Sequence, residues 1–105
     1  MCGIAGIWSF REGVDEAVLR SMTDALVHRG PDDSGIYIDE RNRVSFGHRR
    51  LSILDLSPLG HQPMSNDNET IWITFNGEVY NFVEIRNDLI KRGYSFRSNS
   101  DTEVI

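Results

Sequence analysis

Two short runs of apolar residues constrain the fold of this chain more than any other feature. Residues 3–8 and residues 70–75 each contain isoleucine, tryptophan and few polar side chains, and both runs are too short for a buried helix. Runs of this length and composition are typical of β-strands that are covered on both faces. We therefore expect a fold in which other elements pack against both sides of these strands.

A helix is predicted to follow the first strand. From Val14 onward apolar side chains recur at helical spacing, and they form one stripe of an amphipathic helix. Asp15 is suited to cap its N-terminus. Gly30 followed by Pro31 is a typical stop signal, so the helix is expected to end just before Gly30.

Two further helices are predicted near the end of the chain. Residues 82–92 have helical periodicity, with Asn81 as a candidate N-cap and Gly93 as the stop. Ser100 and Glu103 have the spacing of a capping box, which predicts the start of a last helix. The sequence is therefore expected to stop inside a domain.

The remaining segments predict strands and one long loop. Residues 34–39 and 44–54 are expected to pair as strands through a turn at 40–43, and residues 94–97 are expected to form a short strand. Residues 55–68 contain Pro58, Gly60 and Pro63 and are expected to be a loop. Strands connected this closely favour an α+β fold with mainly antiparallel pairing.

Composition and charge exclude several classes of partner. The 105 residues carry a formal net charge of -5, whereas nucleic acids and anionic membranes select basic surfaces. No apolar run approaches the roughly 20 residues that span a bilayer, and no signal peptide is recognisable. A single cysteine forms no internal disulfide. We expect a cytoplasmic protein whose thiol stays reduced.

Cys2 is the first candidate for chemistry. A lone cysteine is most often a small buried hydrophobic residue. Its position beside the initiator methionine favours another interpretation, because removal of Met1 gives Cys2 both a thiol and a free α-amine. The α-amine has an ordinary pKa of about 7.7–8.0, so it exchanges protons near neutral pH. A nucleophile served by its own N-terminal amine is an established catalytic arrangement.

Asn76 and Gly77 are the second candidates. An Asn-Gly pair is the commonest signal for a tight turn, and a turn needs no function. The functional alternative is an oxyanion hole, in which the Asn76 side-chain amide and the Gly77 backbone N–H donate to a developing negative oxygen. The two interpretations are compatible.

Charged residues offer two more candidates. Arg49 and Arg50 are adjacent, so in a strand only one of them faces a given site. The planar guanidinium of that arginine suits a carboxylate. Asp101 stands in a first helical turn, where acidic residues are common for electrostatic reasons alone. Its functional alternative is to bind an ammonium group.

Metal and phosphate sites find little support in the sequence. His28, His48 and His61 lack the spacing of metal ligands, and one cysteine gives no zinc pattern. Neither common glycine-rich phosphate loop is present. Residues 28–35, which contain two glycines and a proline, predict only a structured turn. We expect no metal and no cofactor in this segment.

Five ordered motifs together resemble the class II glutamine amidotransferases, and in particular those of the asparagine synthetase type. The motifs are the opening residues 1–6, residues 28–35, residues 50–53, residues 75–81 and residues 100–105. The resemblance runs from the first residue to the last. It implies the N-terminal nucleophile hydrolase fold, a four-layer αββα sandwich of two antiparallel sheets between helices, of which residues 1–105 are the N-terminal portion.

The resemblance also implies the roles of individual residues. After Met1 is removed, Cys2 attacks the side-chain amide of glutamine, while Asn76 and the Gly77 N–H hold the oxyanion. Arg50 binds the α-carboxylate of glutamine, and Asp101 binds the α-ammonium with help from Glu78. Arg50 is preferred over Arg49 because it precedes the motif Leu-Ser-Ile.

A second domain is implied in the same full-length chain. In the family this synthetase domain uses ATP and Mg²⁺ to activate an acceptor carboxylate, such as that of aspartate, and it receives the ammonia. Three alternatives remain open. One is a related amidotransferase of a biosynthetic or polysaccharide cluster with another acceptor. The second is an inactive scaffold module of the same fold. The third is a fragment that is inactive alone or pairs with a second copy through its strand edges.

Overall fold

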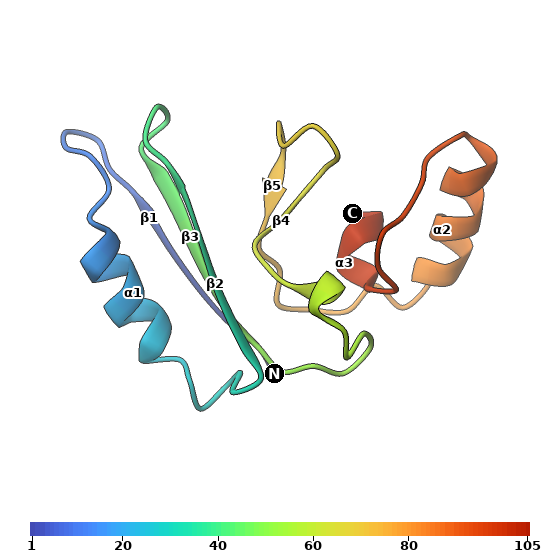
Figure 1. Ribbon diagram of the computed structural model, residues 1–105, viewed down its shortest axis with the longest axis horizontal. Helices are drawn as coiled ribbons and strands as arrows, with labels where there is room; N and C mark the ends of the chain where they lie inside the picture. The colour runs from blue at the N-terminus through green and yellow to red at the C-terminus, as the bar shows by residue number, and fades with distance from the viewer.

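Two antiparallel sheets lie next to each other in the computed structural model, which describes residues 1–105 (Figure 1). The larger sheet has the order β1–β3–β2 and consists of β1 (Gly3–Trp8), β2 (Asp33–Asp39) and β3 (Val44–Arg50). The smaller sheet pairs β4 (Met64–Ser65) with β5 (Trp72–Ile73). The helices are α1 (Glu16–Asp24), the 3-10 helix η1 (Pro58–Gly60), α2 (Phe82–Lys91) and α3 (Asp101–Val104). This architecture confirms the α+β class with antiparallel pairing.

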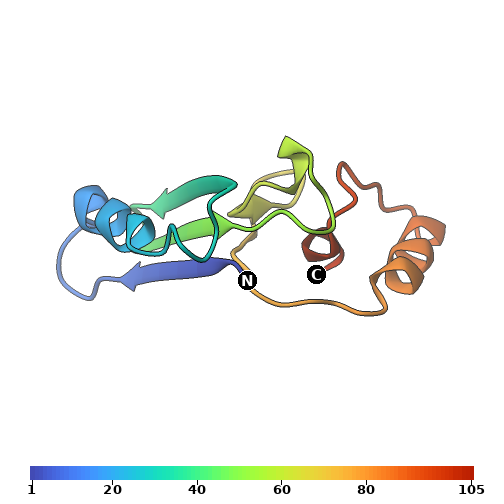
Figure 2. The ribbon, with the colours of Figure 1, turned by 90° about the horizontal axis from the view of Figure 1, so that it is seen from below.

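The molecule is elongated, with extents of 43 × 31 × 19 Å. We call residues 1–50 the first half and residues 58–105 the second half. In both ribbon views α1 and the larger sheet occupy one end, while α2 and α3 occupy the other (Figures 1 and 2). The N-terminus lies in the middle, where the two halves meet. None of the helices has the length and apolar character needed to cross a bilayer.

Strand β1 has the predicted bounds, but it is covered on one face only. Its residues alternate between covered and open, and the outward side chains of Ile4 and Trp8 are 47% and 65% exposed. The covered face packs on α1 and on the turns after it, where Leu26 approaches Gly3 so closely that an added Cβ would lie 2.9 Å from it. The predicted cover on both faces is therefore wrong for β1, because its outward side chains are exposed.

Helix α1 begins as predicted and ends earlier than predicted. The Asp15 carboxylate accepts hydrogen bonds from the N–H groups of Ala17 and Val18 at 2.9 and 3.3 Å. The helix ends at Asp24, not at Gly30, because the following backbone bonds run from i to i−3, as in Val27 N–H to Asp24 O. These tighter turns carry the chain back toward β3.

Several other boundaries differ from the sequence prediction. β3 ends at Arg50 and not at residue 54, and β5 covers only Trp72–Ile73 of the predicted 70–75. Helix α2 has the predicted position and ends at Lys91, and Gly93 just beyond it has φ of +96°. Asn81 makes no capping hydrogen bond with its side chain. Strands β3 and β5 end where backbone N–H groups donate hydrogen bonds to side chains that are distant in the sequence.

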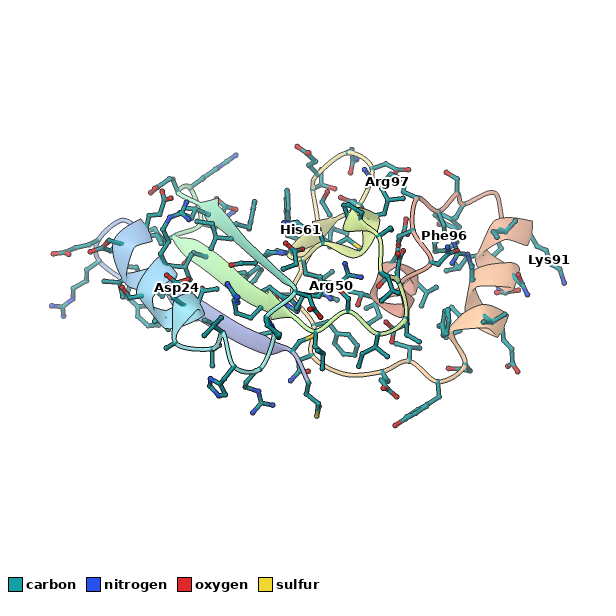
Figure 3. The ribbon with its side chains drawn as sticks, turned by 60° about the horizontal axis from the view of Figure 1, so that its bottom comes forward. Asp24, Arg50, His61, Lys91, Phe96 and Arg97 are labelled. Atoms are coloured by element: carbon teal, nitrogen blue, oxygen red, sulfur yellow. The ribbon has the colours of Figure 1, made fainter.

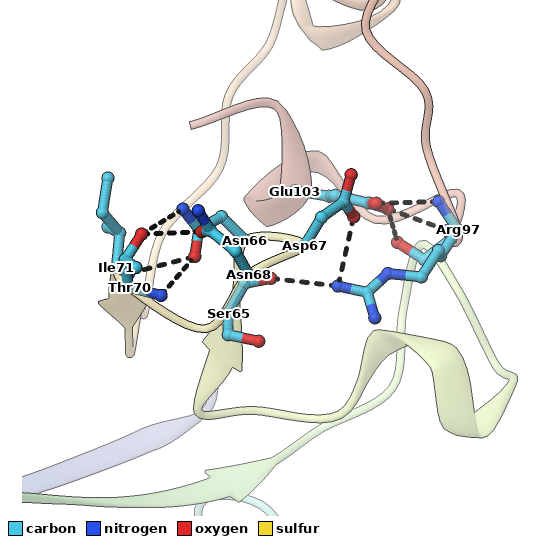
Figure 4. Close-up of polar contacts among 9 residues, drawn as sticks. Ser65, Asn66, Asp67, Asn68, Thr70, Ile71, Arg97 and Glu103 are labelled. Carbon is cyan, nitrogen blue, oxygen red and sulfur yellow. Dashed lines mark hydrogen bonds and ion pairs between the residues drawn. The ribbon is translucent and has the colours of Figure 1, made fainter.

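The predicted strand at 94–97 is absent because a side chain further along the sequence binds the backbone N–H groups at its end. The Glu103 carboxylate accepts hydrogen bonds from the N–H groups of Arg97 and Ser98 at 2.7 and 2.8 Å, so these donors do not enter a sheet. Only the serine half of the predicted capping box forms, with Ser100 Oγ accepting from the Thr102 N–H. Arg97 in turn donates to the Ser65 carbonyl at 3.3 Å and thereby joins α3 to the β4–β5 hairpin (Figure 4).

Several side-chain contacts join the larger sheet to the second half, among them a hydrogen bond of 2.6 Å between His61 Nδ1 and Asp33 Oδ2. Tyr37 stacks on Trp72 with ring centroids 4.0 Å apart. His48, which is 1% exposed, shares a hydrogen bond of 2.9 Å with the Thr74 hydroxyl through Nδ1, and its Nε2 has no partner. Burial lowers the pKa of His48 from 6.5 to about 4, against an opposing effect of Asp33. His48 is therefore a neutral core residue at pH 7.

The apolar core is small. Leu19 and Val104 are the buried hydrophobic residues, whereas Phe10, Leu56 and Tyr80 are 74%, 78% and 90% exposed.

The burial of neutral His48 predicts a pH-dependent stability. Between about pH 6.5 and pH 4 the unfolded chain binds a proton at His48 that the folded chain does not bind. The free energy of unfolding should therefore fall as the pH is lowered through this range, by at most about 1.4 kcal/mol per pH unit. Chemical denaturation of wild type and His48→Gln at several pH values checks this. His48→Gln should flatten the dependence. His28→Gln, which removes an exposed imidazole, should leave it unchanged, and equal slopes for wild type and His48→Gln would contradict the account.

Candidate active site

A cavity of about 340 Å³ lies where the two halves meet, and it brings together all six of the predicted site residues. Those residues are Cys2, Arg50, Asn76, Gly77, Glu78 and Asp101. They come from the start of β1, the end of β3, the segment after β5 and the start of α3. A cavity of this size suits a small metabolite.

Cys2 reaches the cavity because β1 pairs with β3. The register places Gly3 opposite Arg49, so Cys2 lies beside the end of β3. Its Sγ accepts a hydrogen bond from the Leu51 N–H at 3.3 Å and lies 3.7 Å from the Leu51 carbonyl oxygen. The sulfur is half-buried and held by backbone groups, and no histidine is hydrogen-bonded to it. Met1 lines the same cavity.

Residues 29–35 form a frame around Cys2 and the end of β3. Arg29 Nε donates to the Cys2 carbonyl at 3.3 Å, and Asp32 Oδ2 accepts from the Ser52 N–H at 2.8 Å. Gly30 lies so close to β3 that an added Cβ would be 2.3 Å from the Arg49 backbone carbon. Sequence reasoning predicted only a turn here. The two glycines of this run, Gly30 and Gly35, were the available signal for such a close approach.

The two arginines at the end of β3 face in opposite directions, as strand geometry requires. Arg49 Nε donates to the Gly30 carbonyl at 2.9 Å, away from the cavity. Arg50 is 8% exposed and lines the cavity. Figure 3 shows Arg50 in the middle of the molecule, between the larger sheet and α3. Its guanidinium donates to the carbonyls of Ser57, at 2.8 Å, and Asp55. Three of its five N–H donors remain for a ligand.

Asn76 and Gly77 lie in an open bend between β5 and α2. No strand follows them, so they do not form a hairpin turn. Both line the cavity. Gly77 folds back over Phe75, where an added Cβ would lie 2.7 Å from the ring. A larger residue there would displace the tip of the Phe75 ring, and Gly77 itself is exposed.

Asp101 and Glu78 supply negative charge to the cavity. Asp101 is 6% exposed, and its Oδ2 accepts a hydrogen bond from the Val79 N–H at 2.8 Å. This bond fixes the segment that carries Asn76 and Gly77 against α3. Glu78 lies on the same segment and is exposed. Arg50 thus contributes one positive charge to a cavity that also holds the carboxyl groups of Asp55, Glu78 and Asp101.

Two further cavity residues, Asp55 and Gln62, were missed by sequence reasoning, which placed both in a loop. Gln62 donates to the Thr102 hydroxyl at 3.1 Å and accepts from the Phe75 N–H at 2.7 Å. Asp55 accepts from the Asn99 N–H at 2.9 Å and from Ser57. The hydrogen bonds from Ser57 and Asn99 hold the pKa of Asp55 below its ordinary value. No local pattern announces the contacts with Asn99, Thr102 and Phe75, because these three partners are distant in sequence.

The arrangement suits an amino acid better than a simple anion. The Arg50 guanidinium and the carboxylates of Asp101 and Glu78 in one cavity complement a zwitterion, and Cys2 lines the same cavity. No group of three or more His, Cys, Asp or Glu side chains is placed to hold a metal ion.

Comparison with known proteins agrees with this geometry. The family model described as a glutamine amidotransferase domain matches residues 1–105. The chain is 45% identical to the glutamine-hydrolyzing asparagine synthetase 1 of Bacillus subtilis, over the whole chain and 17% of that protein. It is 40% identical to a putative asparagine synthetase of Methanocaldococcus jannaschii and 38% identical to an asparagine synthetase of Arabidopsis thaliana, again over the whole chain.

The chain spans less than a quarter of the length of each of these relatives. The family model matches the whole chain, so the match includes every residue that lines the cavity. The chain belongs to the glutamine amidotransferase domain family.

Proposed function

We propose that this chain is the glutamine-hydrolysing portion of an asparagine synthetase-type amidotransferase. The observation that carries the proposal is the position of Cys2 in one cavity with Arg50 and Asp101, which together match the charges of an amino acid. The two products of the reaction are ammonia and glutamate.

The first half of the reaction forms a thioester. Removal of Met1 frees the α-amine of Cys2 and vacates part of the cavity that Met1 lines. The α-amine accepts the Sγ proton, and Sγ attacks the side-chain amide carbon of glutamine. The Asn76 side-chain amide and the Gly77 N–H donate to the oxyanion that develops. The α-ammonium returns the proton to the leaving nitrogen, and ammonia departs.

The second half restores the enzyme. Water attacks the glutamyl thioester while the α-amine of Cys2 accepts its proton, and the same two donors hold the second oxyanion. The carbon–sulfur bond breaks, Sγ recovers the proton, and glutamate is released. Both halves use the same groups, so no metal or cofactor is needed for hydrolysis.

Selection of glutamine over a simple amide falls to the charged residues. Arg50 binds the α-carboxylate through its remaining N–H donors. Asp101 binds the α-ammonium through Oδ1, since its Oδ2 accepts from the Val79 N–H. Glu78 adds negative charge at the open side of the cavity.

The proposal extends to the parent protein. Residues outside these 105 would complete a four-layer αββα sandwich, for which the exposed apolar side chains of β1 and α2 provide the surface. A synthetase domain of the same chain would use ATP and Mg²⁺ to activate an acceptor such as aspartate, and would accept the ammonia. The lengths of the relatives support this domain, since this chain covers 14–23% of them.

The first test removes the nucleophile and one oxyanion donor in the full-length enzyme. Cys2→Ala should abolish glutamate release. Asn76→Ala should lower kcat for glutamine hydrolysis by about 10²–10³-fold with little change in KM, because it removes a donor used in the transition state. Asn87→Ala, on an exposed position of α2, is the matched control and should hydrolyse glutamine normally. Full activity in Cys2→Ala would refute the proposed function.

The second test separates the two arginines. Arg50→Lys should raise KM for glutamine by roughly 10-fold or more, because an ammonium replaces the planar fork that binds the carboxylate. Arg49→Lys should change KM by less than about 3-fold, since lysine also donates to the Gly30 carbonyl. Steady-state glutaminase kinetics measure both values. A larger effect at Arg49 would show that the site uses the opposite face of β3.

A further inference from the structure

Binding an amino acid through both α-groups requires a fixed distance between the two binding residues. The α-carboxylate and α-ammonium of glutamine share one carbon atom, so their separation does not adapt to the site. Arg50 belongs to the larger sheet in the first half, while Asp101 belongs to α3 in the second half. The two are 51 positions apart in the sequence, so their spacing depends on contacts between the segments that carry them.

Asp55 connects the structures that carry these two residues. On one side the Arg50 guanidinium donates to the Asp55 carbonyl, and the Asp55 carboxylate accepts from the N–H and hydroxyl of Ser57. On the other side Asp55 Oδ2 accepts a hydrogen bond of 2.9 Å from the N–H of Asn99, two residues before Asp101. Asp55 is 7% exposed, so these bonds are shielded from water.

The Asp55 carboxylate is occupied by the chain itself. Oδ1 accepts two hydrogen bonds from Ser57 and Oδ2 accepts one from Asn99. It therefore serves the protein and not the substrate, in contrast to Asp101, which keeps one oxygen free of such bonds.

We propose that Asp55 is a positioning residue that sets the distance between the carboxylate-binding Arg50 and the ammonium-binding Asp101. This inference rests on the proposed glutaminase function. It assigns Asp55 to recognition of the whole amino acid, while Cys2 and Asn76 perform the chemistry.

The test uses the full-length enzyme with the Asp55→Asn substitution. The amide keeps one acceptor oxygen and replaces the other with a donor, so either the Ser57 bonds or the Asn99 bond is lost. KM for glutamine should rise roughly 10- to 100-fold, the usual effect of losing a hydrogen bond to a charged group. Because Cys2 and the oxyanion donors are untouched, kcat should stay within about 3-fold of wild type.

A substrate analogue separates positioning from a general loss of structure. Glutaric acid monoamide has the side-chain amide and the carboxylate of glutamine but no α-ammonium, so it uses Arg50 and not Asp101. Its inhibition constant against glutamine hydrolysis should change by less than about 3-fold in Asp55→Asn. A purely structural defect would weaken the monoamide as much as glutamine, or would lower kcat with KM unchanged, and either result overturns the inference.

Two more variants complete the design. Asp39→Asn is the matched control. Like Asp55, the Asp39 carboxylate accepts hydrogen bonds through both oxygens, in this case from Asn42. Asp39 lies at the end of the β2–β3 pair that is far from the cavity. This substitution should leave KM unchanged. Ser57→Ala removes one donor to Asp55 and keeps the charge, and it should raise KM by roughly 3- to 10-fold. If Asp55→Asn does not fold, this variant decides the question, and an unchanged KM overturns the inference.

Failure of this inference is distinguishable from failure of the proposed function. If wild type releases no glutamate from glutamine, the proposed function fails. If wild type hydrolyses glutamine through Cys2 while Asp55→Asn and Ser57→Ala keep the wild-type KM, the function stands and the positioning role of Asp55 is refuted.

Discussion

The antiparallel pairing of β1 with β3 is the constraint on which the candidate site depends. With Gly3 opposite Arg49, the thiol of Cys2 meets the backbone of Leu51, and Arg50 points into the cavity. A shift of this register by one residue would exchange the two faces of β3 and bring Arg49 to the cavity instead. The frame of residues 29–35 protects the register, because Gly30 and Asp32 contact the last residues of β3 directly. Sheet geometry thus places Cys2 and Arg50 in the same cavity.

Polar contacts, more than apolar packing, assemble the rest of the site. The 17 buried residues include only two large hydrophobic ones and ten that are polar or charged. Six of those ten line the cavity, namely Arg50, Asp55, Gln62, Ser100, Asp101 and Thr102. Buried polar groups are stable only when their partners are in place. The two halves therefore meet in one preferred arrangement, which suits a site whose groups come from both.

The sequence allowed the local features to be predicted and left the long-range ones open. The bounds of β1, the Asp15 cap and the stop at Gly93 follow from residue types close in the chain, and all three are present. The opposite directions of Arg49 and Arg50 follow from strand alternation alone. The absent strand at 94–97 and the early ends of α1 and β3 did not follow, because Glu103 and the frame around Gly30 act across the chain. The same holds for Asp55 and Gln62, whose partners lie up to 44 positions away. The roles of the six predicted site residues remain predictions that kinetics will test. These residues are Cys2, Arg50, Asn76, Gly77, Glu78 and Asp101.

The most direct measurement is the intact mass of the full-length protein before and after exposure to a diazoketone analogue of glutamine. The account predicts one adduct per chain, carried only by chains that lack Met1, located at Cys2 by peptide fragmentation and absent from Cys2→Ala. An adduct on any other residue, or no adduct on chains that have lost Met1, would contradict the central claim that Cys2 is the nucleophile.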